Sequence, residues 1–275
     1  MRFGVHLPQY GRAAGPESIA AVARHAEELG LDDVWVSDHL TVPAGAPYPP
    51  PYLFEPVVTL TWAAAATGRV GLGTSVLVLP YRHPLHLAKE LASLDRLAGG
   101  RLIVGAAAGW LEGEFEALGV PFRERGARTD EAIGALRACW EQDPVDYAGP
   151  RVRITAQRVL PQPGRRLPLW VGGSSPPALE RAVRVGDGWH GTFLGPAEIA
   201  PILARLRQDR PEESFTLSVR TTWDGLVTEA EEIRRSLDAY RGAGLQHLVA
   251  APVQRDLDGW LRSVEALAAV FDEFR

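Results

Sequence analysis

Short apolar, β-branched stretches alternate with longer amphipathic stretches along the whole chain, and this alternation constrains the fold more than any other feature. The apolar stretches are typical of buried strands and cover residues 2–8, 33–38, 69–79, 101–107, 167–173, 188–193, 215–223 and 247–252. The stretches between them have helical spacing and cover residues 16–29, 55–67, 84–97, 128–140, 176–185, 196–206, 228–241 and 257–274. The sequence therefore predicts eight strand–helix units.

Strands that are apolar throughout, each followed by a helix, are typical of a parallel sheet covered by helices. Eight such units in 275 residues predict an α/β fold of the (β/α)8 TIM barrel type, with one domain over residues 1–275. The alternative is an open, doubly wound sheet. That fold would be favoured by a Gly-x-Gly-x-x-Gly turn after the first strand, and LPQYGRAAG does not match this pattern.

Two segments interrupt the strand–helix rhythm. The residues between the fourth and fifth predicted strands include VDYAGPRVRI and RVLPQP, which predict a hairpin insertion beside the barrel. The segment TVPAGAPYPPPYLFEP, residues 41–56, is rich in proline and aromatic residues. It is too long for a simple connector, so we expect a functional loop there.

Composition excludes several classes of protein. The net charge of -5 is unlike the basic surface that nucleic-acid binding requires, and the longest apolar runs are too short to span a membrane. The N-terminal MRFGVHLPQ has no signal-peptide pattern. Cys139 is the only cysteine, which excludes a disulfide within the chain. We therefore expect a cytoplasmic protein.

The second predicted strand, VWVSDHL, ends in an acid and an imidazole, Asp38 and His39. In a (β/α)8 barrel the active site forms at the C-terminal ends of the strands. Histidine titrates near neutral pH, and a nearby carboxylate increases its basicity, so the pair is a candidate for proton transfer. The alternative is a salt bridge or a helix cap at the rim.

Other strand ends would meet at the same mouth. Thr74, Ser75 and Val76 lie near the end of the third strand. Gly172, Gly173, Ser174 and Ser175, in WVGGSSPPALERA, precede a helix and predict a phosphate site; the alternative is a tight turn with a serine cap. The small residues of GAAAGWLEGEF leave volume for a flat cofactor or pack the barrel tightly. His83 and His86 lack an acidic partner at ligand spacing, so no metal site is expected.

Together these motifs resemble the luciferase-like monooxygenase superfamily, and most closely its coenzyme F420-dependent oxidoreductase branch. The motifs are FGVHLPQYG, VWVSDHL, GLGTSVLVLPYRHP, GRLIVGAAAGWLEGEFEALG, RGARTDEAIGALRACW and LPLWVGGSSPPALERAVRVGDGW. The resemblance is close over residues 1 to 192, and beyond them it is limited to the strand–helix rhythm. It implies a (β/α)8 barrel with insertions, a deazaflavin ring in the barrel mouth and a homodimer.

The resemblance also implies roles for individual residues. Asp38 would bind the polar edge of the ring, His39 would transfer a proton at the substrate, and the bond Ser75–Val76 would be a cis peptide. Arg123, Arg125 and Arg128 are candidates for contact with the cofactor's acidic tail. The residues implied in cofactor binding are Asp38, Thr74, Ser75, Val76, Ala108, Gly172, Gly173, Ser174, Ser175 and Arg128.

Two departures from the sugar-phosphate dehydrogenases of this branch bear on the substrate. Those enzymes carry a glutamate in the loop after the fourth strand, where this chain matches with Ala108. They also carry basic residues after the sixth strand, where this chain has Thr192, Phe193 and Leu194. We therefore expect a neutral or apolar substrate. The alternatives are an FMN-dependent monooxygenase of the same superfamily, a non-catalytic barrel that serves as a partner or binding subunit, and a cofactor-free hydrolase or isomerase.

Overall fold

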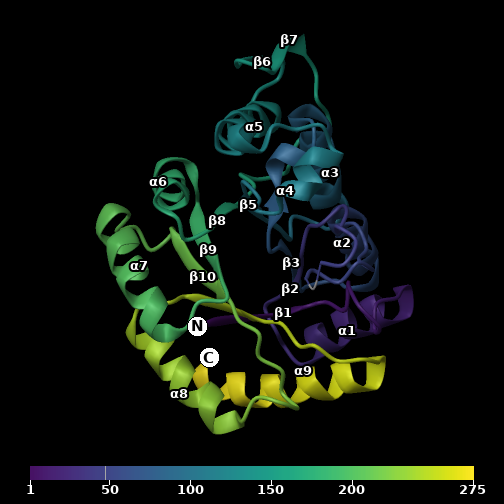
Figure 1. The fold of residues 1–275 in the computed structure, drawn as a ribbon, viewed down its shortest axis with the longest axis vertical. Helices are drawn as coiled ribbons and strands as arrows, with labels where there is room; N and C mark the ends of the chain where they lie inside the picture. Colours follow the sequence, from purple (N-terminus) through teal and green to yellow (C-terminus); the bar gives the residue numbers. More distant parts are fainter. Residues whose placement is uncertain (47) are drawn as a thin grey trace.

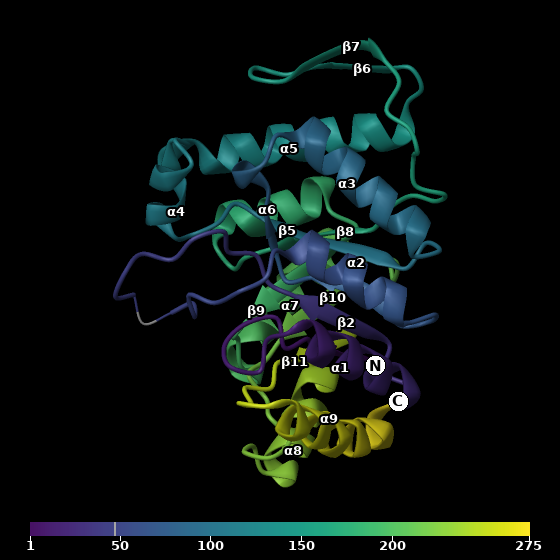
Figure 2. The same cartoon turned by 90° about the vertical axis from the view of Figure 1, so that its right-hand side faces the viewer.

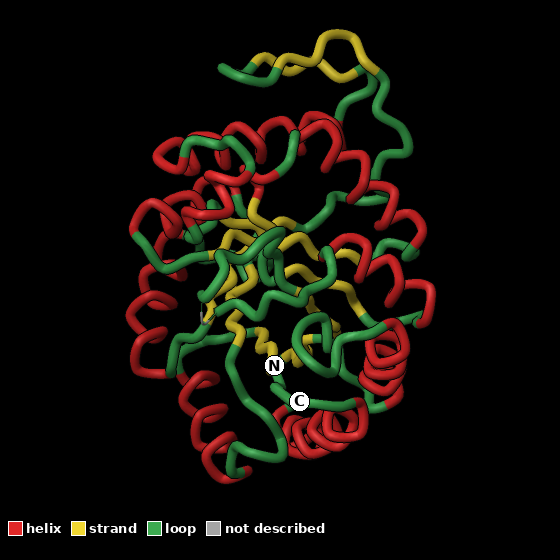
Figure 3. Tube along the Cα trace, turned by 45° about the vertical axis from the view of Figure 1, so that its right-hand side comes forward, coloured by secondary structure: helices red, strands yellow, loops and turns green. Residues whose placement is uncertain are grey.

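The computed structural model describes residues 1–46 and 48–275 and contains a closed barrel of parallel strands surrounded by helices (Figures 1 and 3). The barrel strands are β1 (Arg2–His6), β2 (Asp33–Val36), β3 (Gly71–Thr74), β5 (Leu102–Ala107), β8 (Leu169–Gly172), β9 (Gly188–Thr192), β10 (Thr216–Arg220) and β11 (His247–Ala250). Strand β1 pairs with both β2 and β11, and the ring closes where β3 pairs with β5. The predicted (β/α)8 barrel is confirmed.

The helices follow the strands and form a ring around them in Figure 1. They are α1 (Pro16–Glu28), α2 (Pro56–Ala66), α3 (Pro84–Leu97), α4 (Glu112–Ala117), α5 (Arg125–Glu141), α6 (Pro176–Val185), α7 (Pro196–Asp209), α8 (Ala230–Gly242) and α9 (Leu257–Phe271). Helix α1 shows why they pack as they do: its buried residues Ile19, Val22 and Ala26 recur at helical spacing and form one apolar face. Within the described residues, no helix is both long enough and apolar enough to cross a bilayer.

The inside of the barrel is filled by side chains. Trp35, Ile103, Trp170 and Val249 form a separate buried cluster, in which the rings of Trp35 and Trp170 stack with their centroids 5.5 Å apart. The neighbouring strand makes room with Gly73, because a Cβ atom there would collide with the Trp35 ring. The interior is therefore packed core, and ligands are confined to the barrel ends.

The third predicted strand, residues 69–79, is interrupted. It divides into β3 and β4 (Leu77–Val78), and the peptide bond between Ser75 and Val76, which lies between them, is cis. This is the bond at which the resemblance placed a cis peptide. The backbone N–H of Ser75 still donates to the carbonyl of Val36 on β2, so the interruption stays attached to the barrel wall.

The insertion between the fourth and fifth barrel strands is an antiparallel hairpin, β6 (Val145–Ala148) and β7 (Arg153–Gln157). Figures 1 and 2 show it beyond α5, on the side away from the barrel. The prediction that RVLPQP, residues 158–163, contributes strand structure is wrong. Pro161 and Pro163 lack the backbone N–H that a sheet ladder requires.

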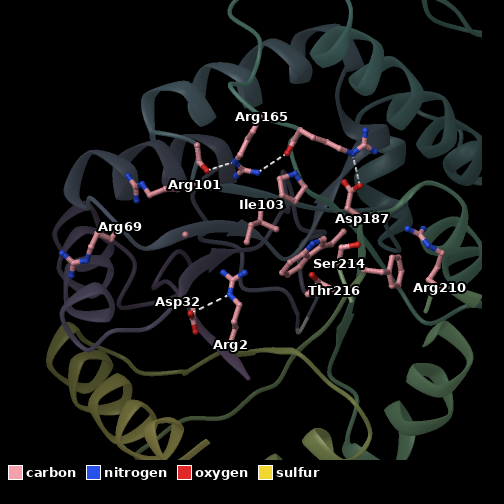
Figure 4. A pocket seen from close by; sticks show the side chains of 16 residues that line it. Arg2, Asp32, Arg69, Arg101, Ile103, Arg165, Asp187, Arg210, Ser214 and Thr216 are labelled. Atoms are coloured by element: carbon pink, nitrogen blue, oxygen red, sulfur yellow. Dashed lines mark hydrogen bonds and ion pairs between the residues drawn. The ribbon is translucent and has the colours of Figure 1, made fainter. Parts of the chain in front are cut away.

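The N-terminal end of the barrel holds a cavity of about 660 Å³ that is ringed by arginines (Figure 4). Their donors are largely committed to the protein. Arg101 donates to carbonyls at the ends of α2 and α3, and Arg165 donates to the carbonyls of Gly100 and Leu102. These arginines tie helix ends to strand beginnings, a stabilising role that is usual for this end of such a barrel.

Candidate active site

A second cavity, of about 670 Å³, opens at the C-terminal ends of the strands. This volume is in the range of sites for small molecules and cofactors. The lining residues come from strand ends and from the loops around α4, α5 and α6: Ser37, Asp38, His39, Tyr48, Ser75, Val76, Val78, Tyr81, Ala107, Ala108, Gly109, Trp110, Arg123, Arg125, Gly126, Gly172, Gly173, Ser175, Pro177, Ala178, Arg181, His190, Thr192, Phe193 and Arg220. The cavity therefore lies where strand order alone predicted the active site.

His39 is held by an acid far away in the sequence. Its Nδ1 lies 2.8 Å from Oε2 of Glu114, a fully buried residue of α4. The other carboxylate oxygen of Glu114 accepts the backbone N–H groups of Leu40 and Thr41. Burial opposes ionisation of Glu114, but hydrogen bonds from His39, Thr41 and the Tyr81 hydroxyl outweigh it and lower the pKa of Glu114. Because a carboxylate only accepts hydrogen bonds, Nδ1 donates, and Nε2 is left to exchange a proton.

The carboxylate of Asp38 is already bound to other parts of the protein. Its oxygens accept from Arg82 Nη1 at 2.6 Å and Nη2 at 2.9 Å, and Oδ2 also accepts from the backbone N–H of Val78. Burial opposes the charge on Arg82, but Asp38 and Glu55 outweigh it and raise the pKa of Arg82. A carboxylate offers about four acceptor positions, so Asp38 retains about one for a ligand. Its contact with a cofactor ring stays a prediction.

The predicted phosphate cradle has fewer donors than the sequence suggested. Gly173 has a φ of 107°, which favours glycine, and the side chain of Ser175 makes no capping hydrogen bond to α6. The first turn of α6 contributes no free N–H group, because two residues there are proline and the N–H groups of Ala178 and Leu179 bind the Ser175 carbonyl. An anion at this position depends on the segment from Gly173 to Ser175 and on the helix dipole.

Most of the residues predicted for cofactor binding or catalysis line the cavity, and three do not. Those in the lining are Asp38, His39, Ser75, Val76, Ala108, Gly172, Gly173 and Ser175. Thr74 is buried in the barrel wall, where its hydroxyl donates to a carbonyl of β5, and Ser174 lies outside the lining. Arg128 pairs with a carboxylate one helical turn earlier. The cavity side is occupied by Arg123 and Arg125 instead.

Sequence reasoning did not single out several residues of the site. Among them are Tyr81, Glu114 and Arg220, which come from separate elements. No spacing rule connects Glu114 to His39, since 75 positions separate them. Arg220 did leave a signal, because it is the one charged residue within the predicted strand FTLSVRTTW.

The cavity floor is connected to the barrel interior by a line of buried hydrogen bonds. Ser75 Oγ lies 2.7 Å from His190 Nε2, and His190 Nδ1 lies 2.7 Å from Ser218 Oγ. The line continues through His247, whose Nδ1 is 2.6 Å from Ser218 Oγ and whose Nε2 is 2.8 Å from Asp33 Oδ1. Burial lowers the pKa of His190 well below its usual value, so this imidazole is neutral. The network fixes the Ser75 side chain at the floor.

The described part of the proline-rich segment, residues 41–46 and 48–56, contributes one residue to the cavity lining. Figure 2 shows these residues projecting from the barrel on the same side as α4. That the segment is a functional loop stays a prediction. Tyr48 lines the cavity and stacks on Trp110, with the two ring planes 13° apart. Trp110 in turn meets the His39 ring edge-on, with ring centroids 5.9 Å apart. A pair of aromatic rings thus lies beside the imidazole.

Comparison with known proteins shows to which family a chain with this fold and cavity belongs. The family model described as luciferase-like monooxygenase matches residues 1–268. The chain belongs to the luciferase-like monooxygenase family. The match extends beyond residue 192, so the last third of the chain is also part of the family and not merely similar in rhythm.

Proteins similar to this luciferase-like chain include F420-dependent enzymes and a monooxygenase. It is 37% identical to an F420-dependent glucose-6-phosphate dehydrogenase from Kineococcus radiotolerans, over 81% of this chain and 65% of that enzyme. The chain thus spans less than two thirds of that relative's length. Among solved structures, the monooxygenase RslO1 from Streptomyces bottropensis superposes with a TM-score of 0.87 at 24% identity, covering 100% of both chains. An F420-dependent secondary alcohol dehydrogenase superposes with a TM-score of 0.81 at 19% identity, covering 98% of both chains. The two superpositions establish the shared fold.

Proposed function

We propose that this protein is an F420-dependent oxidoreductase that transfers a hydride between the deazaflavin and a small organic substrate. The observation that carries the proposal is the hydrogen-bonded pair formed by His39 and the buried Glu114 at the cavity wall. The relative from Kineococcus radiotolerans supports the choice of cofactor, because its name states that it depends on F420.

The residues around the cavity fit such a cofactor. A wall of small residues, Ala107, Ala108, Gly109 and Gly172, leaves space for a flat ring. Gly172 is required for this shape, because a Cβ atom there would press on Val76 and Ala107. At the rim, Arg123 and Arg125 offer positive charge to the acidic tail of F420.

The chain's own side chains would handle the proton that accompanies hydride transfer. When bound, F420 supplies or accepts the hydride. His39 exchanges a proton with the substrate through Nε2, while Glu114 accepts the hydrogen bond from Nδ1 and stabilises the charged imidazole. Tyr81 donates a 2.8 Å hydrogen bond to the same carboxylate and keeps it in place. The ion pair between Asp38 and Arg82 holds the cavity wall beside His39.

Cofactor titration tests the proposal directly. Apo protein is titrated with F420 and with FMN, and binding is followed by the fluorescence of its eight tryptophans. We expect saturable binding of F420 in the micromolar range and no binding of FMN. Binding of FMN alone would make the protein an FMN-dependent monooxygenase, and binding of neither cofactor would favour a non-catalytic barrel. Full activity without any cofactor would favour a hydrolase or isomerase.

We also propose that the protein is a homodimer and that it associates through α2. This helix exposes 67% of Val58 and 53% of Trp62 beside an apolar groove of about 510 Å³. Apolar patches of this kind mark association surfaces. We expect Trp62→Asp to give a monomer in sedimentation velocity. Leu97→Asp is the control, because Leu97 is 79% exposed outside the groove, and loss of the dimer in that variant alone would contradict the assignment.

The protein is assigned to the cytoplasm on the basis of its cysteine content. Its single cysteine, Cys139, is buried and cannot form a disulfide within the chain. This composition is typical of proteins that fold in a reducing compartment.

A further inference from the structure

Arg220 is the last residue of β10, and its side chain lies at the floor of the active-site cavity. Only 6% of the residue is exposed. Nη1 donates to Ser37 Oγ at 2.6 Å and to the Ser75 carbonyl at 2.8 Å. Both acceptors are neutral. Nε is buried and has no hydrogen-bond partner among the described residues.

The guanidinium of Arg220 differs in its charge balance from those of Arg82 and Arg181, which lie beside the cavity. Arg82 forms an ion pair with Asp38, and Arg181 forms one with Asp130. Within residues 1–46 and 48–275, no carboxylate lies in salt-bridge contact with Arg220. A buried charge without a counter-ion is costly, and proteins usually pair such charges. Arg220 is thus the buried cation whose partner the protein itself does not provide.

The groups around Arg220 do not offset its charge. Burial lowers the pKa of Arg220, and the groups that act in the opposite direction are the phenols of Tyr48 and Tyr10, which are uncharged near neutral pH. Burial also lowers the pKa of His6 to about 3, and that of His190 falls well below its usual value. Both imidazoles are therefore neutral at physiological pH. The cavity floor carries one net positive charge.

The orientation of the guanidinium is fixed. The ring of Phe193 covers it, with the ring centroid 4.6 Å from Cζ. Phe193 has a φ of 59°, a conformation that residues with a side chain seldom adopt, which places the ring over Arg220. Nη1 is held by Ser37 and Ser75, and the Tyr48 side chain is a further hydrogen-bond partner of the guanidinium, so Nε is the donor that remains for a ligand. An arginine edge of this kind matches the paired oxygens of a carboxylate or a phosphate.

We propose that Arg220 binds an anionic oxygen group of the substrate, so that the substrate is an organic carboxylate or phosphate rather than a neutral compound. This reverses the expectation drawn from Thr192, Phe193 and Leu194, because the cation comes from the seventh strand and not from the sixth. The assignment of the anion to the substrate rests on the proposed function. The existence of an anion site at Arg220 does not.

The anion site is tested without any turnover. Protein labelled with [15N]arginine is titrated with benzoate, inorganic phosphate and neutral benzamide, and the Nε–H signal of Arg220 is followed by NMR. Arg220→Lys identifies that signal by removing it. We expect benzoate or phosphate to shift the signal saturably and benzamide to leave it in place. Absence of a saturable shift with either anion would overturn the proposal.

Variants then locate the source of the anion. Arg220→Gln removes the charge, and we expect it to weaken binding of the effective anion about 10- to 100-fold, as for loss of a charged hydrogen bond. Arg262→Gln is the matched control, because it removes the positive charge of an arginine that is 65% exposed and lies outside the cavity lining, and anion binding should stay unchanged. Equal loss in both variants would show that the effect comes from the overall charge of the protein and would overturn the site.

F420 affinity separates the substrate from the cofactor as the anion's source. We expect Arg220→Gln to bind F420 with the same affinity as the wild type. A loss of F420 affinity as large as the loss of benzoate affinity would assign the anion to the cofactor and overturn the substrate assignment. Thermal unfolding of each variant confirms that it is folded. If the protein bound FMN instead, the proposed function would fail while the benzoate shift at Arg220 would remain.

Discussion

Replacing His39 by alanine is expected to lower turnover about 10²- to 10⁴-fold, the usual contribution of a positioned acid or base. F420 affinity should be unchanged, because the side chain is only one of many that line the cavity. Turnover is measured from the F420 absorbance with a substrate found by screening carboxylates and phosphates. Unchanged turnover would remove His39 from the mechanism.

Two further measurements show whether His39 acts chemically or only structurally. Added imidazole should restore part of the turnover of His39→Ala, since the space left by the ring lies at the cavity wall. A structural role would give no such rescue. Glu114→Gln keeps the shape of the acid that holds Nδ1 but removes its charge, so we expect a loss of turnover smaller than that of His39→Ala. A Glu114→Gln variant with full turnover would show that the charge is not needed.

Replacing Gly105 by alanine is expected to destabilise the barrel by about 3 kcal/mol or more, or to prevent folding. Gly105 lies in β5 beside the interrupted third strand. A Cβ atom there would overlap the carbonyl oxygen of Thr74, which is backbone and cannot rotate away. The free energy of unfolding is measured by urea denaturation. A variant as stable as the wild type would show that β3 and β5 are less tightly packed than the structure indicates.

Gly242→Ala provides the control for this prediction. Gly242 is the last residue of α8, and nothing lies within 4 Å of an added Cβ atom. We expect its stability to equal that of the wild type or to exceed it by up to about 1 kcal/mol, because alanine favours the helix. The comparison also shows that the small residues of GAAAGW have two different roles. Gly105 allows the backbone of the third strand to pass, whereas Ala107, Ala108 and Gly109 border the cavity.

Local patterns were sufficient for much of the fold. The eight apolar stretches became the barrel strands because each contains β-branched residues bounded by turn residues, which is a property of neighbouring positions. The same reasoning failed for RVLPQP, because its two prolines lack the backbone N–H groups that a sheet ladder requires. It also missed the interruption between β3 and β4, which the resemblance alone suggested.

The location of Asp38 and His39 was determined by the sequence, because the C-terminal end of every parallel strand faces the same mouth. Their partners were decided by the tertiary structure alone. Glu114 reaches His39 across 75 positions, and Arg220 reaches the Ser75 carbonyl across 145. Such pairs form only when the barrel closes and brings the ends of separate strands and helices together. Periodicity therefore predicts where a residue lies in its own element, whereas its hydrogen bonds and its charge balance depend on neighbours that the closed fold supplies.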